Sequence, residues 1–218
     1  MEIFLVGGAI RDQILGIASE TTEKDYVVVG SSPEELLSLG YRQVGKEFPV
    51  FLHPETHDEY ALARIERKVG KGYKGFEFDT SKTVTLEQDL SRRDLTVNAI
   101  AQKIDGNGSY IDPYGGIEDI KKKTLRHVSD AFSEDPVRIL RTARFASRFS
   151  NLGFTIDDKT LELIKKMVVS GEVDALTSER VFKEIALSMQ TESPSVFFEV
   201  LIESRAYERL FPMLELSN

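Results

Sequence analysis

The chain has 218 residues, of which 41% are hydrophobic and 29% are charged, and its formal net charge is −8. This composition is typical of a globular protein with one large domain or two small ones. The sequence contains no cysteine, which excludes disulfides and thiolate metal sites. No apolar run approaches the roughly 18 residues of a membrane span, and the N-terminus lacks the pattern of a signal peptide. The sequence therefore predicts a cytoplasmic protein with no membrane partner.

The overall acidity conceals one basic segment. Between Lys121 and Arg148 there are eight basic residues and three acidic ones, a local charge of +5. Such a segment on an acidic protein can still neutralise the phosphates of a nucleic acid. An ordinary solvated helix face is the alternative interpretation, and charge alone does not decide between the two.

The first half of the chain predicts an irregular mixture of strands and helices. Short apolar or β-branched runs indicate strands, and capped periodic runs indicate helices. Strands are expected at residues 3–6, 26–29, 50–52 and 59–63, and helices at residues 9–15, 33–39, 86–90 and 117–122. A segment with three glycines and two lysines at residues 69–75 is predicted to be a mobile loop.

After about His127 the pattern is helical only. The best-defined helix is predicted to begin near Ser133, which would cap it, with Glu134 and Asp135 in the first turn. Four arginines then fall within an arc of roughly 120°, apart from the apolar residues, so the helix is expected to bury one face and expose an arginine row. This row comprises Arg138, Arg141, Arg144 and Arg148. Further helices are expected at residues 157–169, 177–189 and 194–204.

Two acidic residues precede the predicted strand at residues 26–29. Glu23 and Asp25 alternate along the chain, so on an extended backbone both would project to the same side and share a hard cation such as Mg²⁺. Glu59 starts another predicted strand and would complete the cluster. The alternative is that these are exposed acids at a strand edge, and the pattern alone leaves both interpretations open.

Phosphate-binding residues are suggested at two places. Gly7 and Gly8 follow a predicted strand and open a helix, an arrangement that lets a phosphate approach backbone N–H groups, with Arg11 one turn further on. Arg93, in the run Arg92-Arg93-Asp94, can pair with a triphosphate. A tight turn and a surface salt bridge are the alternatives.

The order of these motifs is more specific than any one of them. The string at residues 5–12, followed by Gly16, resembles the opening motif of tRNA nucleotidyltransferases and bacterial poly(A) polymerases, the class II branch of the polymerase-β-like superfamily. Further matches follow in order: the carboxylate pair before residues 27–30, then residues 92–99, 112–116, 134–138 and 176–181. Residues 48–54 and 59–64 resemble the CCA-adding enzymes of gamma-proteobacteria. The chain departs from the family in having Glu23 where the metal motif has aspartate, and in being much shorter.

The resemblance implies an α+β fold with two domains. Residues 1–127 would form a polymerase-β-like nucleotidyltransferase head, a mixed sheet with flanking helices. Residues 128–218 would form an all-helical neck that selects the nucleotide. The implied activity is template-independent addition of C and/or A to the 3′ end of tRNA from CTP and ATP. A poly(A) polymerase and a catalytically weak RNA-binding relative are the alternatives, and the oligomeric state is not predicted.

The resemblance also implies a role for each candidate residue. Glu23 and Asp25 would hold Mg²⁺ for two-metal nucleotidyl transfer, with Glu59 as a third catalytic carboxylate. Gly8, Arg11 and Arg93 would bind the triphosphate. The remaining nucleotide-binding residues lie on the predicted neck helix, where Asp135 and Arg138 would read the base edge and where Arg141 and Arg144 would support the base or the triphosphate.

Overall fold

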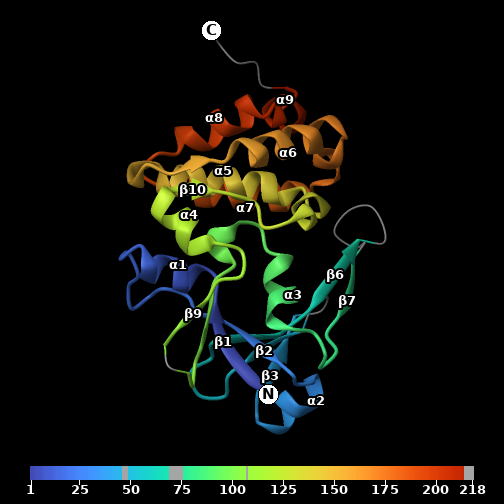
Figure 1. Cartoon of the computed structure of the whole chain (residues 1–218). Coiled ribbons are helices and arrows are strands. Elements are labelled where there is room, and N and C mark those ends of the chain that lie inside the picture. Colours follow the sequence, from blue (N-terminus) through green and yellow to red (C-terminus); the bar gives the residue numbers. More distant parts are fainter. Residues whose placement is uncertain (46–48, 69–75, 107, 214–218) are drawn as a thin grey trace. The chain divides into compact units, whose positions relative to one another are not determined.

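The computed structural model describes residues 1–45, 49–68, 76–106 and 108–213. The chain divides into two compact units (Figure 1). The first comprises Met1–Arg67 with Phe76–Ile120, and the second holds the chain from Lys121 onward. The loop predicted at residues 69–75 lies outside the described residues, and the predicted domain boundary after residue 127 stays a prediction.

Within the described residues, seven strands of the first unit form one mixed sheet in the order β3-β4-β5-β2-β1-β8-β9. β2 and β5 are parallel, whereas the other neighbouring pairs are antiparallel. The mixed sheet that the resemblance implied is therefore confirmed. The strands are β1 (Glu2–Val6), β2 (Asp25–Val29), β3 (Arg42–Val44), β4 (Val50–Leu52), β5 (Glu59–Leu62), β8 (Ala101–Lys103) and β9 (Tyr110–Ile111).

Alternation along the strands separates the two faces of this sheet. One face carries a hydrophobic cluster that includes Val28, Phe51 and Leu62, and α2 (Pro33–Ser38) packs there through Leu36. Ser32 caps α2 in a reciprocal capping box with Glu35, as the sequence pattern at residues 32–35 favours. Because successive strand residues point to opposite faces, Asp25 and Glu59 project to the other face.

The other elements of the first unit are helices and a two-stranded hairpin. The helices are α1 (Gly8–Ile14), α3 (Leu86–Ser91), the 3₁₀ helix η1 (Thr96–Asn98) and α4 (Gly116–Lys122). β6 (Ile65–Lys68) and β7 (Phe76–Asp79) pair only with each other in the described structure. β3, β6, β7, β8 and β9 were not predicted, because they are short or contain charged and polar residues and lack the apolar runs that mark β1, β2, β4 and β5.

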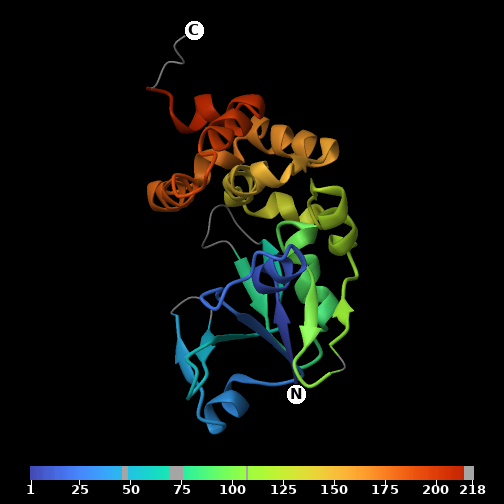
Figure 2. The same ribbon diagram turned by 90° about the vertical axis from the view of Figure 1, so that its left-hand side faces the viewer.

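The second unit is built mainly from helices, which Figures 1 and 2 show gathered around α5. α5 (Val137–Phe149) packs against α7 (Ser178–Ser188) and α8 (Ser195–Glu203). The unit also contains α6 (Asp158–Val169), α9 (Ala206–Leu210) and the 3₁₀ helices η2 (Asp130–Glu134), η3 (Ser150–Leu152) and η4 (Glu172–Ala175). Its core includes Ile139, Leu140, Ala143, Phe197 and Leu201.

The start of α5 differs from the sequence prediction. Ser133 does not cap the helix, because it lies in η2 and its hydroxyl donates to the Asp130 carbonyl. α5 begins at Val137, whose N–H is accepted by Asp135 Oδ1 at 3.1 Å. The predicted all-helical pattern also has one exception, since β11 (Thr155–Ile156) pairs with β10 (Thr124–Leu125). Apolar spacing located the helix, whereas its first turn depended on local hydrogen bonds.

The prediction of an exposed arginine row on α5 is wrong for Arg138, which is only 8% exposed. Arg141 and Arg144 are half-buried, and Arg148 alone among the four is exposed. Packing causes the difference: Arg138 turns back to the Ala131 carbonyl, and Arg144 pairs with Glu184 of α7.

No helix in the described parts of the chain is both long and apolar enough to span a membrane.

Candidate active site

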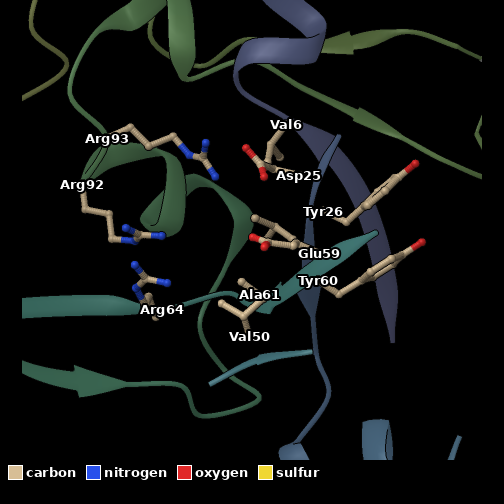
Figure 3. A pocket seen from close by; sticks show the side chains of 11 residues that line it. Val6, Asp25, Tyr26, Val50, Glu59, Tyr60, Ala61, Arg64, Arg92 and Arg93 are labelled. Atoms are coloured by element: carbon tan, nitrogen blue, oxygen red, sulfur yellow. The ribbon is translucent and has the colours of Figure 1, made fainter. Parts of the chain in front are cut away.

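A pocket opens on the sheet face that carries Asp25 and Glu59. Figure 3 shows both carboxylates pointing into it, opposite the guanidinium groups of Arg64, Arg92 and Arg93. The rings of Tyr26 and Tyr60 point away from the carboxylates in the same view. The pocket therefore has an acidic side on the sheet and a basic side around the end of α3 and the start of β6.

Strand register places the two carboxylates side by side. Asp25 pairs with Glu59 in the parallel β2–β5 ladder and with Val6 in the antiparallel β1–β2 ladder. Both acids are exposed, so neither is buried in the core. Glu23 is exposed too, but it precedes β2 and does not line the pocket. The structure thus brings Asp25 and Glu59 together and leaves Glu23 beside them on the entering loop.

The basic side is organised by two acids that the sequence analysis did not single out. Asp89 is fully buried and accepts from Arg92 Nη2 at 2.8 Å and from Arg93 Nη2 at 3.3 Å. Glu66 Oε1 lies 2.7 Å from Arg64 Nε and 2.9 Å from Arg92 Nη1. Burial, together with repulsion from Arg92, lowers the pKa of Arg64 to about 10. The spacing of Asp89 three and four residues before the arginines was a readable signal for this contact.

Arg93 retains an unsatisfied donor. Its Nε is the one buried side-chain nitrogen or oxygen, among the residues described, that has no hydrogen-bond partner. Its Nη1 lies 3.5 Å from the Asn98 carbonyl, at the limit of a hydrogen bond. A buried N–H without a partner is costly, and an anionic ligand in the pocket would satisfy it.

The glycine turn at residues 7–8 lies close to Arg93 of this pocket, and Arg11 follows the turn in α1. Gly7 has a φ of 71°, and a Cβ built on it would meet Arg93 Nη1 at 3.0 Å. Gly8 is less constrained, because its Cβ would lie 3.5 Å from Arg11 Nη2. Arg11 is only 3% exposed and donates to Asp12 and to Asn98. In this structure Arg11 holds the start of α1 against the 94–98 segment, and its predicted contact with the triphosphate stays a prediction.

In the second unit, the predicted base-reading residues lie around the start of α5. Asp135 Oδ2 accepts from Arg180 Nη2 at 2.7 Å, and Arg138 Nη1 donates to the Ala131 carbonyl at 2.7 Å. Arg144 pairs with Glu184 at 2.5 Å. Arg180 and Glu184, four residues apart on α7, were missed, although the matched motif at residues 176–181 contains the first of them.

Comparison with known proteins identifies the family of the chain. Residues 3–126 match the family described as the poly A polymerase head domain, and this match spans more than half of the chain. The chain belongs to the poly A polymerase head domain family. Residues 153–217 also match a family described as a probable RNA and SrmB-binding site of polymerase A.

Relatives of this head-domain protein are named for CCA addition. The chain is 59% identical over 212 residues to a multifunctional CCA protein of Shewanella denitrificans, covering 97% of this chain and 50% of the relative. It is 58% identical over 215 residues to the same-named protein of Alkalilimnicola ehrlichii, covering 99% of this chain and 51% of that protein. The chain therefore spans about half the length of the curated relatives it matches.

Two solved structures that resemble this chain are complexes, one with a nucleotide and one with a tRNA and a nucleotide analogue. A complex of a CCA-adding enzyme with CTP aligns with a TM-score of 0.78 at 29% identity, covering 99% of this chain and 50% of that one. A tRNA nucleotidyltransferase complexed with a primer tRNA and an incoming ATP analogue aligns with a TM-score of 0.76 at 30% identity, covering 99% and 61%. The predicted resemblance and the predicted head fold are confirmed.

The carboxylates of this head domain fit a divalent cation. Asp25 and Glu59 both direct hard oxygen donors into the pocket, which is the ligand type that Mg²⁺ prefers (Figure 3). In the described chain no three acidic or histidine side chains lie close enough to hold one metal ion. The predicted set of Glu23, Asp25 and Glu59 is thus not assembled as a triad, and a bound ion would complete its shell with water and phosphate oxygens, as Mg²⁺ commonly does.

Proposed function

We propose that this chain carries the nucleotide-transferring part of a template-independent tRNA nucleotidyltransferase, which adds C and/or A to the 3′ end of tRNA from CTP and ATP. The observation that supports this most directly is the two-sided pocket, where Asp25 and Glu59 face three arginines (Figure 3). Nucleotidyl transfer uses a cation, which carboxylates can hold, and a bound triphosphate, which guanidiniums can hold. The pocket offers both kinds of group.

The reaction joins the 3′-oxygen of the RNA to the α-phosphorus of the nucleotide and breaks the bond to the departing pyrophosphate. Mg²⁺ bound at Asp25, with Glu59 and Glu23 nearby, would lower the pKa of the 3′-hydroxyl and stabilise the leaving group. Arg93 offers the buried Nε–H that lacks a partner, so it is the residue we assign to the phosphates. Gly8 and Arg11 support the turn beside it and remain the further candidates for the triphosphate.

Base selection is assigned to the start of α5. A carboxylate only accepts hydrogen bonds, so Asp135 would select the amino group of C or A, and Arg138 would donate to the neighbouring ring nitrogen. G and U present a carbonyl at that place, which would face the acceptor. Such a mismatch permits discrimination on the order of 10⁴. Arg141 and Arg144 would support the base or the triphosphate from the same helix.

One structural fact bears on this assignment. Arg138 is 8% exposed and donates to the Ala131 carbonyl, so its guanidinium is positioned by the η2 turn rather than by solvent. A guanidinium has five N–H donors, and one bond to a carbonyl is compatible with a second bond to a base. The turn before α5 therefore becomes part of the proposed base-reading site.

The test is incorporation of labelled CTP or ATP by this chain. Three tRNA substrates are used, one ending before CC, one ending before A, and one complete. The proposal expects C on the first and A on the second, with no extension of the third. A run of A on all three would indicate a poly(A) polymerase, and binding without incorporation would indicate an RNA-binding relative. Asp25→Asn is the control for residual activity, since it removes the charge but keeps the shape.

A further inference from the structure

Asp89 lies beneath the basic side of the pocket and makes four contacts with the three arginines. It is 0% exposed. Its Oδ1 accepts from Arg92 Nε at 3.1 Å, from Arg92 Nη2 at 2.8 Å and from the backbone N–H of Arg64 at 3.2 Å. Its Oδ2 accepts from Arg93 Nη2 at 3.3 Å. One buried carboxylate therefore joins the end of α3 to the start of the β6–β7 hairpin.

The sequence and helix geometry explain why Asp89 reaches two of these arginines. Asp89 is on α3, which ends at Ser91, and Arg92 and Arg93 follow directly. Side chains three and four residues apart lie on the same helix face. The contact with Arg64 has no such local origin, because it crosses from the segment after β5 and depends on the fold.

The negative charge of Asp89 stabilises three arginines that lie close together. The three guanidiniums repel one another, and the nearness of Arg92 contributes to the lowered pKa of Arg64. Asp89 and Glu66 place two negative charges among these three positive ones and so reduce the repulsion between them. Burial would raise the pKa of Asp89, but Arg92 and Arg93 bring it below its ordinary value, so the carboxylate stays ionised. Asp89 does not itself line the pocket.

We propose that Asp89 is a positioning residue of the nucleotide pocket, and that its carboxylate fixes the guanidiniums of Arg92 and Arg93 in the orientation that receives the triphosphate. This rests on the proposed function, because it assumes that the pocket binds a nucleotide. The carboxylate holds the guanidinium of Arg93 through Nη2, while Nε–H has no partner among the described residues. A fixed fork loses less conformational freedom when a phosphate binds.

The test is nucleotide affinity in the Asp89→Asn variant, measured by calorimetry with CTP and with pyrophosphate as separate probes. Asparagine keeps the shape and an acceptor oxygen but removes the charge. We expect CTP affinity to fall on the order of tenfold, the size of one coupled pair in an ion-pair network. In an Arg93→Ala background the same substitution should change affinity less, because the part of its effect that passes through Arg93 is already lost and only the part through Arg92 is left.

Asp119→Asn is the matched control. Asp119 is also buried in the first unit and accepts from Thr96 Oγ1 at 2.7 Å, and it does not line the pocket. Its loss should leave CTP affinity unchanged. An Asp89→Asn variant that binds CTP as tightly as the unaltered chain, or more tightly, overturns the proposal, and so do independent effects of Asp89→Asn and Arg93→Ala.

Arg93→Lys keeps the test decisive if Asp89→Asn does not fold. Lysine retains the charge but lacks the planar fork, so it cannot hold Asp89 and a phosphate in the same way. We expect affinity close to that of Arg93→Ala, and wild-type affinity in Arg93→Lys would contradict a fixed guanidinium. If the unaltered chain binds neither CTP nor pyrophosphate, the proposed function itself fails, whereas unchanged binding in the variants refutes only the role of Asp89.

Discussion

Arg180 of α7 donates through Nη2 to Oδ2 of Asp135, in the turn before α5, at 2.7 Å. The two side chains are 25% and 21% exposed, so the pair is largely shielded from water. The other oxygen of Asp135 accepts the N–H of Val137. The carboxylate assigned to base selection is thus held at both oxygens, by one neighbouring residue and by one residue 45 positions away.

Arg180→Ala should reduce the preference for CTP and ATP over UTP and GTP. Without Arg180 the Asp135 carboxylate can rotate, and an error of about 1 Å in such a site costs on the order of 10²-fold in rate. The free energy of unfolding should fall by about 1 kcal/mol or less, because the pair is partly exposed. Single-nucleotide incorporation and urea unfolding measure the two effects. Arg209→Ala is the control, since its pair with Asp174 is more exposed. Unchanged selectivity would show that Asp135 needs no support from α7.

Arg138→Ala and Asp135→Ala should both lose selectivity, but they should differ in stability. The sequence placed Arg138 in an exposed arginine row, where its removal would cost little stability. Since Arg138 is buried and satisfies the Ala131 carbonyl, its removal should lower the free energy of unfolding by about 1–3 kcal/mol. Asp135→Ala should cost less. Thermal unfolding separates the two, and full selectivity in either variant would contradict the base-reading assignment.

Gly7→Ala should impair the chain more than Gly8→Ala. Gly7 has φ 71° and ψ −128°, a region that is nearly exclusive to glycine and costs other residues about 1–3 kcal/mol. Its Cβ would also displace Arg93 Nη1, whereas a Cβ on Gly8 makes ordinary contacts. Stability and CTP affinity should therefore both fall for Gly7→Ala, and Gly8→Ala should fold normally. Equal stability of the two variants would contradict the role of the turn.

The stability contributed by Asp89 should depend on pH in the acid range. Its pKa in the folded chain is lowered from 3.8, so the ionised carboxylate stabilises the fold above that value, and this contribution is lost as the pH falls through the folded pKa. The difference in unfolding free energy between the unaltered chain and Asp89→Asn should be constant near neutral pH and shrink in strong acid. Urea unfolding across that range measures it. A difference that is independent of pH would mean that the charge of Asp89 contributes nothing.

Binding of tRNA by this chain should be weak and should fall steeply with salt. The basic segment at residues 121–148 offers fewer charges than its sequence suggests, because Arg126 pairs with Asp157, Arg144 pairs with Glu184, and Arg138 is buried. Lys121→Ala should reduce the slope of log affinity against log salt by about 1 if this lysine contacts a phosphate. Lys166→Ala, outside the segment, is the control. Tight binding that is insensitive between about 50 and 200 mM salt would assign the contact to another surface.

Local patterns in the sequence were sufficient for much of the fold. The capping box of Ser32 and Glu35 is formed as its spacing indicates. The β-branched run at residues 27–29 lies in β2, which begins at the candidate metal ligand Asp25. The helices predicted at residues 157–169 and 177–189 are present as α6 and α7. The ordered motifs gave the family and its head fold, because each motif is a short contiguous string that needs no knowledge of distant contacts.

The sequence by itself determined which chemical groups are present and which of them share a helix turn or a strand. Only the tertiary structure decided that Asp25 lies beside Glu59, since that depends on the parallel register of β2 and β5. It also decided the partners of Asp135 and Asp89, because Arg180 and Arg64 come from other elements. The burial of Arg138 also depends on packing, since its guanidinium donates to the Ala131 carbonyl in η2. Helical and strand periods specify which way a side chain faces, whereas the residue it meets depends on which elements pack together far along the chain.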